Sequence, residues 1–179
     1  YEQYNENGSE DFITRKWLDN QFYVINYNLN YQKNNINLIF GSTYSEYDGD
    51  HYGETIWSQN SGDIEFTDLF YNGNGSKKDF SNFVKSIYQF SERISIYADL
   101  QLRKIDYITS GSTSNVDELA VNKKYSFFNP KAGFNYTLND KNEIYFSLSR
   151  AFREPTRSDY ENNLNIQPEE LVDYEFGWK

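Results

Sequence analysis

Two alternating runs joined by a turn occupy residues 128–153, and they constrain the fold more than any other stretch of this chain. In the first run the apolar residues share one face: they are Phe128, Pro130, Ala132, Phe134, Tyr136 and Leu138. The residues between them are mostly polar, and this period of two is that of a β-strand. Asn139, Asp140 and Asn142 favour a reversal, because Asn and Asp tolerate positive φ. Alternation then resumes to Leu148, so the stretch is predicted to be a β-hairpin.

Five further stretches extend this pattern to about seven strands. Alternation is found over residues 21–32, 36–44, 79–90, 94–103 and 172–179, and extended character begins near residue 12 and persists toward residue 57. The third of these runs is the least regular, because Phe83 and Ile87 fall among its polar positions. Beyond Lys104 the apolar phase slips to Ile105 and Tyr107 on the former polar face. That slip predicts a bulge or a strand end.

The links between the predicted strands alternate in length. Short turns are expected at 33–35, 91–93 and 139–142, and long polar links at 58–78, 110–124 and 154–170. Within the second long link, residues 116–121 have a pattern that allows one helical turn. Short turns at one end and long loops at the other are typical of outer-membrane barrels, and a slanted crossing needs strands of ~9 to 11 residues. The predicted fold is therefore all-β, an antiparallel up-and-down transmembrane β-barrel segment.

Other β architectures fit the pattern less well. A propeller or β-helix would repeat at a fixed length, and an immunoglobulin-like sandwich would have strands of about five or six residues. Hydrophobic residues make up only 37% of the chain although aromatic residues reach 19%, which favours strands whose two faces meet different solvents. A soluble sandwich that binds carbohydrate stays open as an alternative, with the aromatic stripe as its dry inner face.

Charge and residue usage exclude several classes of function. The net charge of −10 argues against nucleic acid, because phosphate binding needs clustered Lys and Arg. With no Cys and one His, the chain has no disulfide framework, thiolate metal site or cysteine nucleophile. No paired nucleophile and base and no glycine-rich phosphate loop stand out. We therefore expect no catalytic residues, no cofactor and no enzyme activity.

Two motifs near the end of the sequence suggest a family. The first is Ser-x-Ser-x-x-Phe-Arg-x-Pro, carried by Ser147, Ser149, Phe152, Arg153 and Pro155. The second is Pro-Glu-x-Leu-x-x-Tyr-Glu-x-Gly, carried by Pro168, Glu169, Leu171, Tyr174, Glu175 and Gly177. In this order and spacing they resemble the barrel of TonB-dependent outer-membrane receptors, and residues 47–54 resemble a segment of Bacteroidetes-type members.

The resemblance implies a function for the parent protein rather than for this segment alone. Such receptors import a bulky nutrient, a siderophore, vitamin or glycan, by energy-coupled transport across the bacterial outer membrane. Their implied partners are outer-membrane lipid, a plug domain, the TonB complex and the substrate. Members have a plug, a TonB box and twenty-two strands, so residues 1–179 are interpreted as a single, incomplete barrel domain. A non-transport outer-membrane barrel, adhesive or structural, is the alternative.

Candidate site residues follow from alternation and from loop position. Phe66, Phe70 and Tyr71 are the candidate ligand contacts, because they lie in the longest link. Residues predicted to face the lumen, and in the parent the plug, are Arg153, Asp173 and Glu175, together with Lys131, Asn135 and Lys179. Residues predicted to face lipid are Phe134, Tyr136, Leu138, Tyr174, Phe176 and Trp178.

One short cluster raises the question of a metal. Asp48, Asp50 and His51 bring two carboxylates and the imidazole together in the sequence, and such groups bind Ca²⁺ or transition metals. The spacing does not match that of a calcium-binding loop. We therefore expect a polar rim here and no metal.

Overall fold

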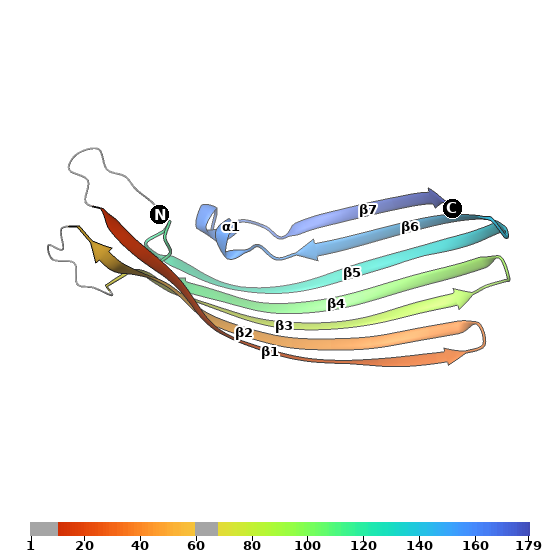
Figure 1. The fold of residues 1–179 in the computed structure, drawn as a ribbon. Helices are drawn as coiled ribbons and strands as arrows, with labels where there is room; N and C mark the ends of the chain where they lie inside the picture. Colours follow the sequence, from red (N-terminus) through yellow and green to blue (C-terminus); the bar gives the residue numbers. More distant parts are fainter. Residues whose placement is uncertain (1–10, 60–67) are drawn as a thin grey trace.

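Seven antiparallel strands lie side by side in sequence order in the computed structural model, which describes residues 11–59 and 68–179 (Figure 1). The strands are β1 (Phe12–Lys33), β2 (Ile36–Ser58), β3 (Leu69–Gln89), β4 (Ile94–Gly111), β5 (Leu119–Asn139), β6 (Asn142–Arg153) and β7 (Glu169–Trp178). The short turns gather at one end of the sheet and the long links at the other. The predicted up-and-down arrangement is confirmed.

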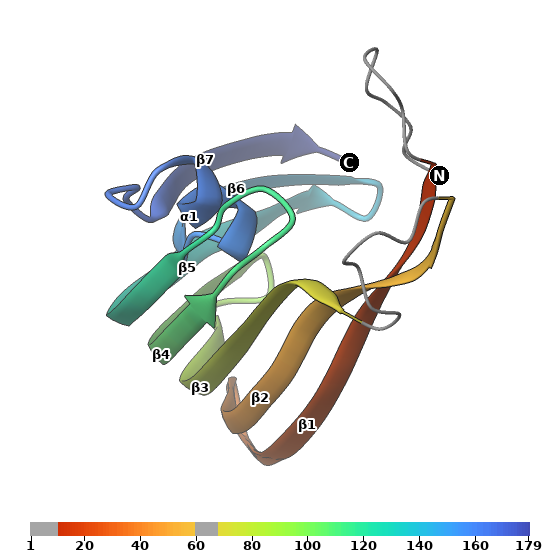
Figure 2. The same ribbon diagram turned by 90° about the vertical axis from the view of Figure 1, so that its left-hand side faces the viewer.

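The sheet is curved, and the short helix α1 (Arg157–Asn162) lies within the curve (Figure 2). Side chains that alternate along each strand therefore project either from a concave face, on the side of α1, or from a convex face. Among the described residues, no helix is long and apolar enough to cross a membrane.

An apolar belt covers the convex face in the half nearest the short turns. Ile96, Phe134, Phe146 and Phe176 are direct partners in the register and form one row across β4 to β7. All four side chains are exposed, with Phe176 at 74%. Large apolar side chains on an open surface need a covering phase, because monomeric soluble proteins rarely expose such contiguous patches.

Charged residues replace the belt farther from the short turns. Glu46, Lys78, Asp106 and Lys124 are successive partners across β2 to β5. Lys78 pairs with Glu46 at 3.3 Å, and Lys124 pairs with Asp106 at 3.3 Å. Strands β1 to β5 have 18 to 23 residues, whereas crossing a bilayer takes ~9 to 11. The sheet therefore extends well beyond its apolar belt.

Several predicted boundaries were wrong. Strand β3 begins at Leu69 rather than near residue 79, and β4 runs to Gly111 without the bulge or strand end expected after Lys104. The helical turn that the pattern of residues 116–121 allows is not formed, since β5 begins at Leu119. Beyond the belt both faces of a strand carry polar residues, so the alternation that identifies a strand is lost there.

The apolar phase slip after Lys104 has a packing cause. Ile105 is 1% exposed on the concave face, and Tyr107 stacks on Tyr160 of α1. The helix thus covers the concave side of a strand that continues unbroken. Apolar residues lie on the convex face in one part of β4 and on the concave face in the next. In the sequence this change of face looks like a slip of the alternation.

The concave face as the candidate functional site

The third long link folds back onto the concave face and carries α1. Thr156 caps the helix: the amide of Asp159 donates to its Oγ1 at 3.3 Å, and the amide of Thr156 donates to Asp159 Oδ2 at 2.8 Å. This reciprocal capping box satisfies amides that have no partner within the helix. The bond from the Thr156 backbone, followed by that from its side chain, holds the pKa of Asp159 below its usual value.

Tyr160 fastens this helix to the sheet. Its side chain is 0% exposed, its ring stacks on Tyr107 with 5.8 Å between centroids, and its hydroxyl contacts that of Tyr125. Leu119 and Val121 complete the cluster. Burial and the bond to Tyr125 raise the pKa of the Tyr160 phenol, so it stays neutral.

A charged network fixes the beginning of the same link. Arg103 of β4 donates from Nε to Asp79 Oδ2 at 2.9 Å and from Nη1 to Glu154 Oε2 at 2.9 Å. Lys77 of β3 donates to Glu154 as well. Burial by itself would raise the pKa of Glu154, but the bond from Lys77, a backbone bond and the charges of Lys77 and Arg103 together lower it. Glu154 is therefore a buried, ionised anchor.

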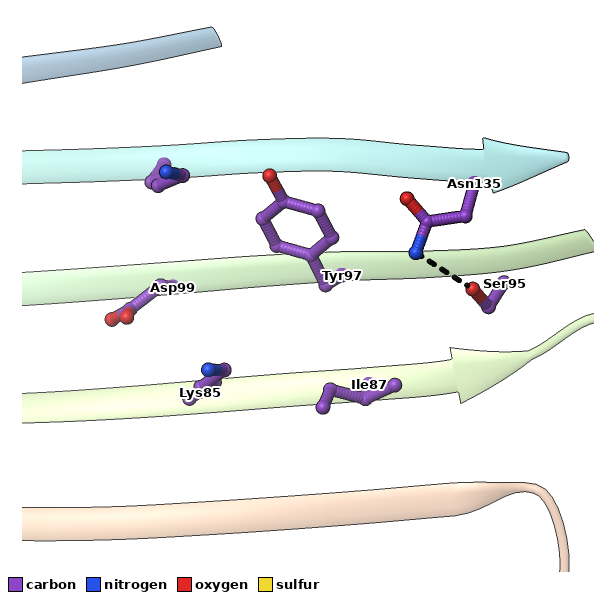
Figure 3. Close-up of a pocket in the computed structure, with 7 residues that line it drawn as sticks. Lys85, Ile87, Ser95, Tyr97, Asp99 and Asn135 are labelled. Carbon is purple, nitrogen blue, oxygen red and sulfur yellow. Dashed lines mark hydrogen bonds between the residues drawn. The ribbon is translucent and has the colours of Figure 1, made fainter. Parts of the chain in front are cut away.

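Nearer the short turns the concave wall contains a hollow of roughly 400 Å³ (Figure 3). Three rows of cross-strand partners build it. Lys85, Asp99 and Lys131 form a charged row; Ile87 and Tyr97 form the second with Gly133; and Ser95 and Asn135 form the third. Asn135 Nδ2 donates to Ser95 Oγ at 3.4 Å. The hollow combines two ammonium groups, one carboxylate and neutral hydrogen-bonding groups.

Arg157 lies at the other end of the concave face, near the long links. A Cβ on Gly73 would clash with its guanidinium, so glycine lets Arg157 lie against β3. Arg157 Nη2 donates to the carbonyl of Ser112 at 3.4 Å, and its Nε is 3.9 Å from Glu161. Its Nε and Nη1 are buried without a hydrogen-bond partner in the described part of the chain.

The predicted ligand residues lie in a different setting from the one expected. Phe66 is outside the described residues, whereas Phe70 and Tyr71 belong to β3 and not to a loop. Their rings meet edge to face at 5.1 Å, and both lie over Gly53 of β2. The two aromatic residues are thus held on a strand near the long links.

The predicted lumen-facing residues are divided between the wall and its rim. Lys131 and Asn135 line the hollow. The register carries the same face to β7, where Asp173 is opposite Ser149 and Glu175 accepts a bond from Ser147 Oγ at 2.9 Å. Arg153 instead pairs with Glu169 at 2.8 Å, at the exposed ends of β6 and β7.

The proximity of Asp48, Asp50 and His51 in sequence does not bring them together in space. Asp48 and Asp50 project from the convex face and both accept from Asn74 Nδ2. His51 is on the concave face, where its Nε2 lies 3.4 Å from the Tyr47 hydroxyl. Among the described residues, no three His, Asp or Glu side chains gather as a metal site.

The network of Lys77, Asp79 and Arg103 was not among the predicted site residues. A signal for part of it was present, because a short turn fixes the register of a hairpin. The turn before Ile94 places Arg103 opposite Ser81, one diagonal step from Asp79. The position of Glu154 cannot be predicted in this way, because Glu154 lies in a long link. A long link, unlike a short turn, does not fix which strand residues lie opposite it.

The family of the chain follows from its match to a family model. The model of the TonB dependent receptor-like β-barrel matches residues 1–179. The chain belongs to this family. Receptors of the TonB-dependent family are transport proteins of outer membranes and not enzymes, and the soluble-sandwich alternative is thereby wrong. No curated protein matches the chain.

Solved structures of two transporters and an uptake receptor are similar to the chain in fold. The copper transporter OprC has a TM-score of 0.77 and 14% sequence identity. The match covers 92% of this chain and 28% of the OprC chain. The ferric citrate transporter FecA, in its unliganded form, has a TM-score of 0.66 and 11% sequence identity. The match covers 97% of this chain and 26% of the FecA chain. The ferric yersiniabactin uptake receptor FyuA from Yersinia pestis has a TM-score of 0.55 and 11% sequence identity. The match covers 96% of this chain and 27% of the FyuA chain. The chain thus spans about a quarter of the length of these transporters.

Proposed function

We propose that the chain forms part of the wall of a TonB-dependent transporter that imports a bulky nutrient across the bacterial outer membrane. The observation that carries this proposal is the family match over the whole chain. A siderophore, a vitamin and a glycan are the three cargo classes considered. Outer-membrane lipid, a plug domain, the TonB complex and the cargo are the proposed partners, and residues 1–179 are proposed to be one incomplete barrel domain.

The two faces of the sheet take different roles in this proposal. The convex belt, including Phe134, Tyr136, Leu138, Tyr174, Phe176 and Trp178, contacts lipid. The concave face, including Lys131, Asn135, Asp173, Glu175 and Lys179, lines the lumen. Barrel walls of this kind alternate apolar outward and polar inward residues, and their long loops are extracellular. The long links and α1 are then at the extracellular mouth.

Cargo contact is proposed at that mouth. Phe70 and Tyr71 lie on β3 beside the long links, and Phe70 is 44% exposed. Exposed aromatic rings next to a wet lumen supply stacking area for a bulky ligand. Phe66 remains a proposed contact of the neighbouring link, and Arg153 remains a proposed plug-facing residue together with Asp173 and Glu175.

Uptake by the complete receptor tests this function. Cells that depend on the receptor are supplied with labelled siderophore, vitamin or glycan, with and without a protonophore that collapses the energy source. We expect one cargo class to accumulate only in energised cells that have the receptor. Phe70→Ala with Tyr71→Ala should weaken cargo binding about tenfold or more, as loss of aromatic anchors does in other interfaces.

A control pair on the opposite face completes the test. Tyr174→Ala and Phe176→Ala remove two aromatic rings from the convex belt and should leave cargo affinity unchanged. A complete gene that encodes no plug domain, or accumulation that is independent of energy, would overturn the transport proposal in favour of a non-transport barrel.

A further inference from the structure

Strand β5 has an open edge in the half nearest the long links. Its ladder with β6 ends at Lys131 and Ser149, whereas its ladder with β4 continues to Leu119. Figure 1 shows β5 continuing past the end of β6. The opening lies inside the sheet, because β6 and β7 follow it in the strand order.

Pro130 fixes the point where the opening begins. The amide of Thr137 donates to the carbonyl of Arg93 at 2.8 Å, and antiparallel pairs alternate between those that exchange hydrogen bonds and those that do not. Because β4 and β5 pair without a register shift, odd-numbered residues of β5 bond to β4 and even-numbered ones face β6. Proline has no amide hydrogen, so Pro130 cannot continue the ladder to β6. Asn129 Oδ1 instead accepts from the amide of Phe152 at 3.0 Å.

The backbone beyond Pro130 lacks partners on this edge. Five residues direct an N–H and a C=O away from β4, and in the described part of the chain these groups form no hydrogen bond: Ala120, Asn122, Lys124, Ser126 and Phe128. On the concave side α1 covers the same stretch, where Leu119 and Val121 are buried with Tyr160. The edge is therefore reached from the convex side, and such an edge is a template for another strand.

Positive charges border the open edge. Lys104 of β4 lies opposite Ser126, and Lys123 belongs to β5 itself. Both side chains are exposed, and neither forms an ion pair or a hydrogen bond with the residues that the structure describes. Lys124, by contrast, is paired with Asp106 at 3.3 Å. Two ammonium groups are thus uncompensated here, in a chain whose net charge is −10.

These charges select among the strands that could pair with the edge. A second copy of this chain, related by a two-fold axis through the middle of the open stretch, would place Lys124 opposite its own copy, and like charges directly opposite are destabilising. Cargo in the lumen is separated from the edge by α1. An acidic strand that approaches from outside the barrel gains both backbone hydrogen bonds and ion pairs.

We propose that the edge of β5 from Ala120 to Phe128 binds an extended acidic segment of a partner protein at the cell surface. The segment joins the sheet as an added strand, a known mode of peptide recognition, and its carboxylates pair with Lys104 and Lys123. The long links on this side are extracellular in barrels of this kind. The inference uses only the edge and its charges, so it does not depend on transport of a cargo.

Amide exchange in the complete receptor, held in nanodiscs, tests the edge. The amides of Lys124 and Ser126 should exchange about a hundredfold faster than those of Lys123 and Tyr125, which bond to β4. A probe peptide that alternates Glu and Val should protect the even-numbered amides, whereas one that alternates Lys and Val should not. Protection of the even-numbered amides without a probe would overturn the proposal, since another part of the receptor would then fill the edge.

Substitutions separate the backbone contribution from the charges. Ser126→Pro removes one outward amide and no bond to β4, and it should weaken binding of the acidic probe about tenfold, whereas Ser126→Ala should not. Lys104→Glu with Lys123→Glu should also weaken binding about tenfold. Lys33→Glu with Lys141→Glu makes the same charge change at the short turns and should have no effect. Heat-modifiable mobility on gels checks that each variant barrel is folded.

Photocross-linking on intact cells tests the nature of the occupant. A benzophenone side chain at Ser126 keeps the backbone amide and should link to an acidic segment of a different protein, mapped by mass spectrometry. The charge reversal at Lys104 and Lys123 should abolish this link. The absence of a link, a link that survives the charge reversal, or a link to the receptor itself, to a second copy or to cargo would overturn the proposal.

Discussion

Four glycines of the concave face lie under aromatic rings of the neighbouring strand. Tyr97 faces Gly133, Phe83 faces Gly41, Tyr71 faces Gly53 and Tyr145 faces Gly177, each pair being direct partners in the register. Glycine in a strand interior is unfavourable by about 0.5 to 1 kcal/mol because of its backbone freedom. A ring packed across it restores buried area, a device used in designed sheets. Phe83, which falls among polar positions in the sequence, has this role.

Filling one of these sites should destabilise the barrel. A Cβ at Gly133 would lie 2.7 Å from the Tyr97 ring and would also clash with the carbonyl of Phe146. We expect Gly133→Ala to lower the free energy of unfolding by about 1 to 3 kcal/mol, the usual effect of overpacking. Urea unfolding of the complete barrel in liposomes measures this.

Gly75 offers a matched control for that substitution. It is also on the concave face, but a Cβ there would have no atom within 4 Å. Gly75→Ala should leave stability unchanged or raise it slightly. If Gly133→Ala lost no more stability than Gly75→Ala, the atoms that surround Gly133 would have to move aside freely.

At the scale of elements, α1 is held by few contacts and is separable from the sheet. Tyr160 is the buried residue of the helix. The polar contacts with the rest of the chain are those of Glu154 with Arg103, of Arg157 with the Ser112 carbonyl and of Glu161 with Asn115. A six-residue helix has no stability of its own in water. The inward fold of the third link therefore depends on these side chains.

Removing the Tyr160 side chain should release the helix without unfolding the wall. Tyr160→Ala is expected to cost about 3 to 5 kcal/mol of local stability, as for other buried aromatic residues. Amide protection of residues 157–162 should then be lost, while protection in β4 and β5 stays. Tyr160→Phe keeps the stacked ring and loses only the bond to Tyr125, so about 0.5 to 1.5 kcal/mol is expected. Equal effects of the two would contradict a packing role.

The pH dependence of the same link follows from Glu154. Its pKa in the folded protein is lowered from the ordinary 4.5. A lowered pKa gives stability that is present above the unfolded value and is lost as the pH falls through the folded value. Protection of residues 157–162, corrected for intrinsic exchange, should be constant from pH 8 to 6 and fall at acidic pH below the ordinary 4.5. Glu154→Gln should be less protected at neutral pH and lose less protection in acid than the unsubstituted protein, the remaining loss coming from Asp159, whose pKa is lowered as well.

Sequence pattern predicted the seven strands and their order because each has an apolar convex face over part of its length. It did not predict the half of β3 nearest the long links, where Asn72, Asn74, Ser76 and Lys78 alternate only with glycine and lysine. It also did not predict α1 or its anchor, since Tyr160 pairs with Tyr107 and Tyr125 across long links. A period of two in the sequence reveals a strand that has one apolar face. Contacts between segments far apart in the chain produce no such period.

For the whole molecule, the belt on the convex face sets the position relative to the membrane. On β5 it runs from Phe128 to Leu138, about ten steps of ~3.4 Å, or about 26 Å in height for a strand tilted by ~40°. This matches the apolar band of outer-membrane barrels, which is about 25 Å tall. The row of Glu46, Lys78, Asp106 and Lys124 lies beyond its edge, where charged groups meet water.

A charge placed on either face of one strand tests this arrangement. Phe134 lies in the belt with Ile96 and Phe146 as its partners, whereas its neighbour Asn135 lines the hollow of the concave face. Phe134→Arg should lower the free energy of unfolding in liposomes by about 2 to 4 kcal/mol, the effect of Arg near the middle of a bilayer. Asn135→Arg meets water and polar groups and should cost far less. Because a register slip of one residue exchanges the two faces, the reverse order of stabilities would mean that lipid covers the concave side.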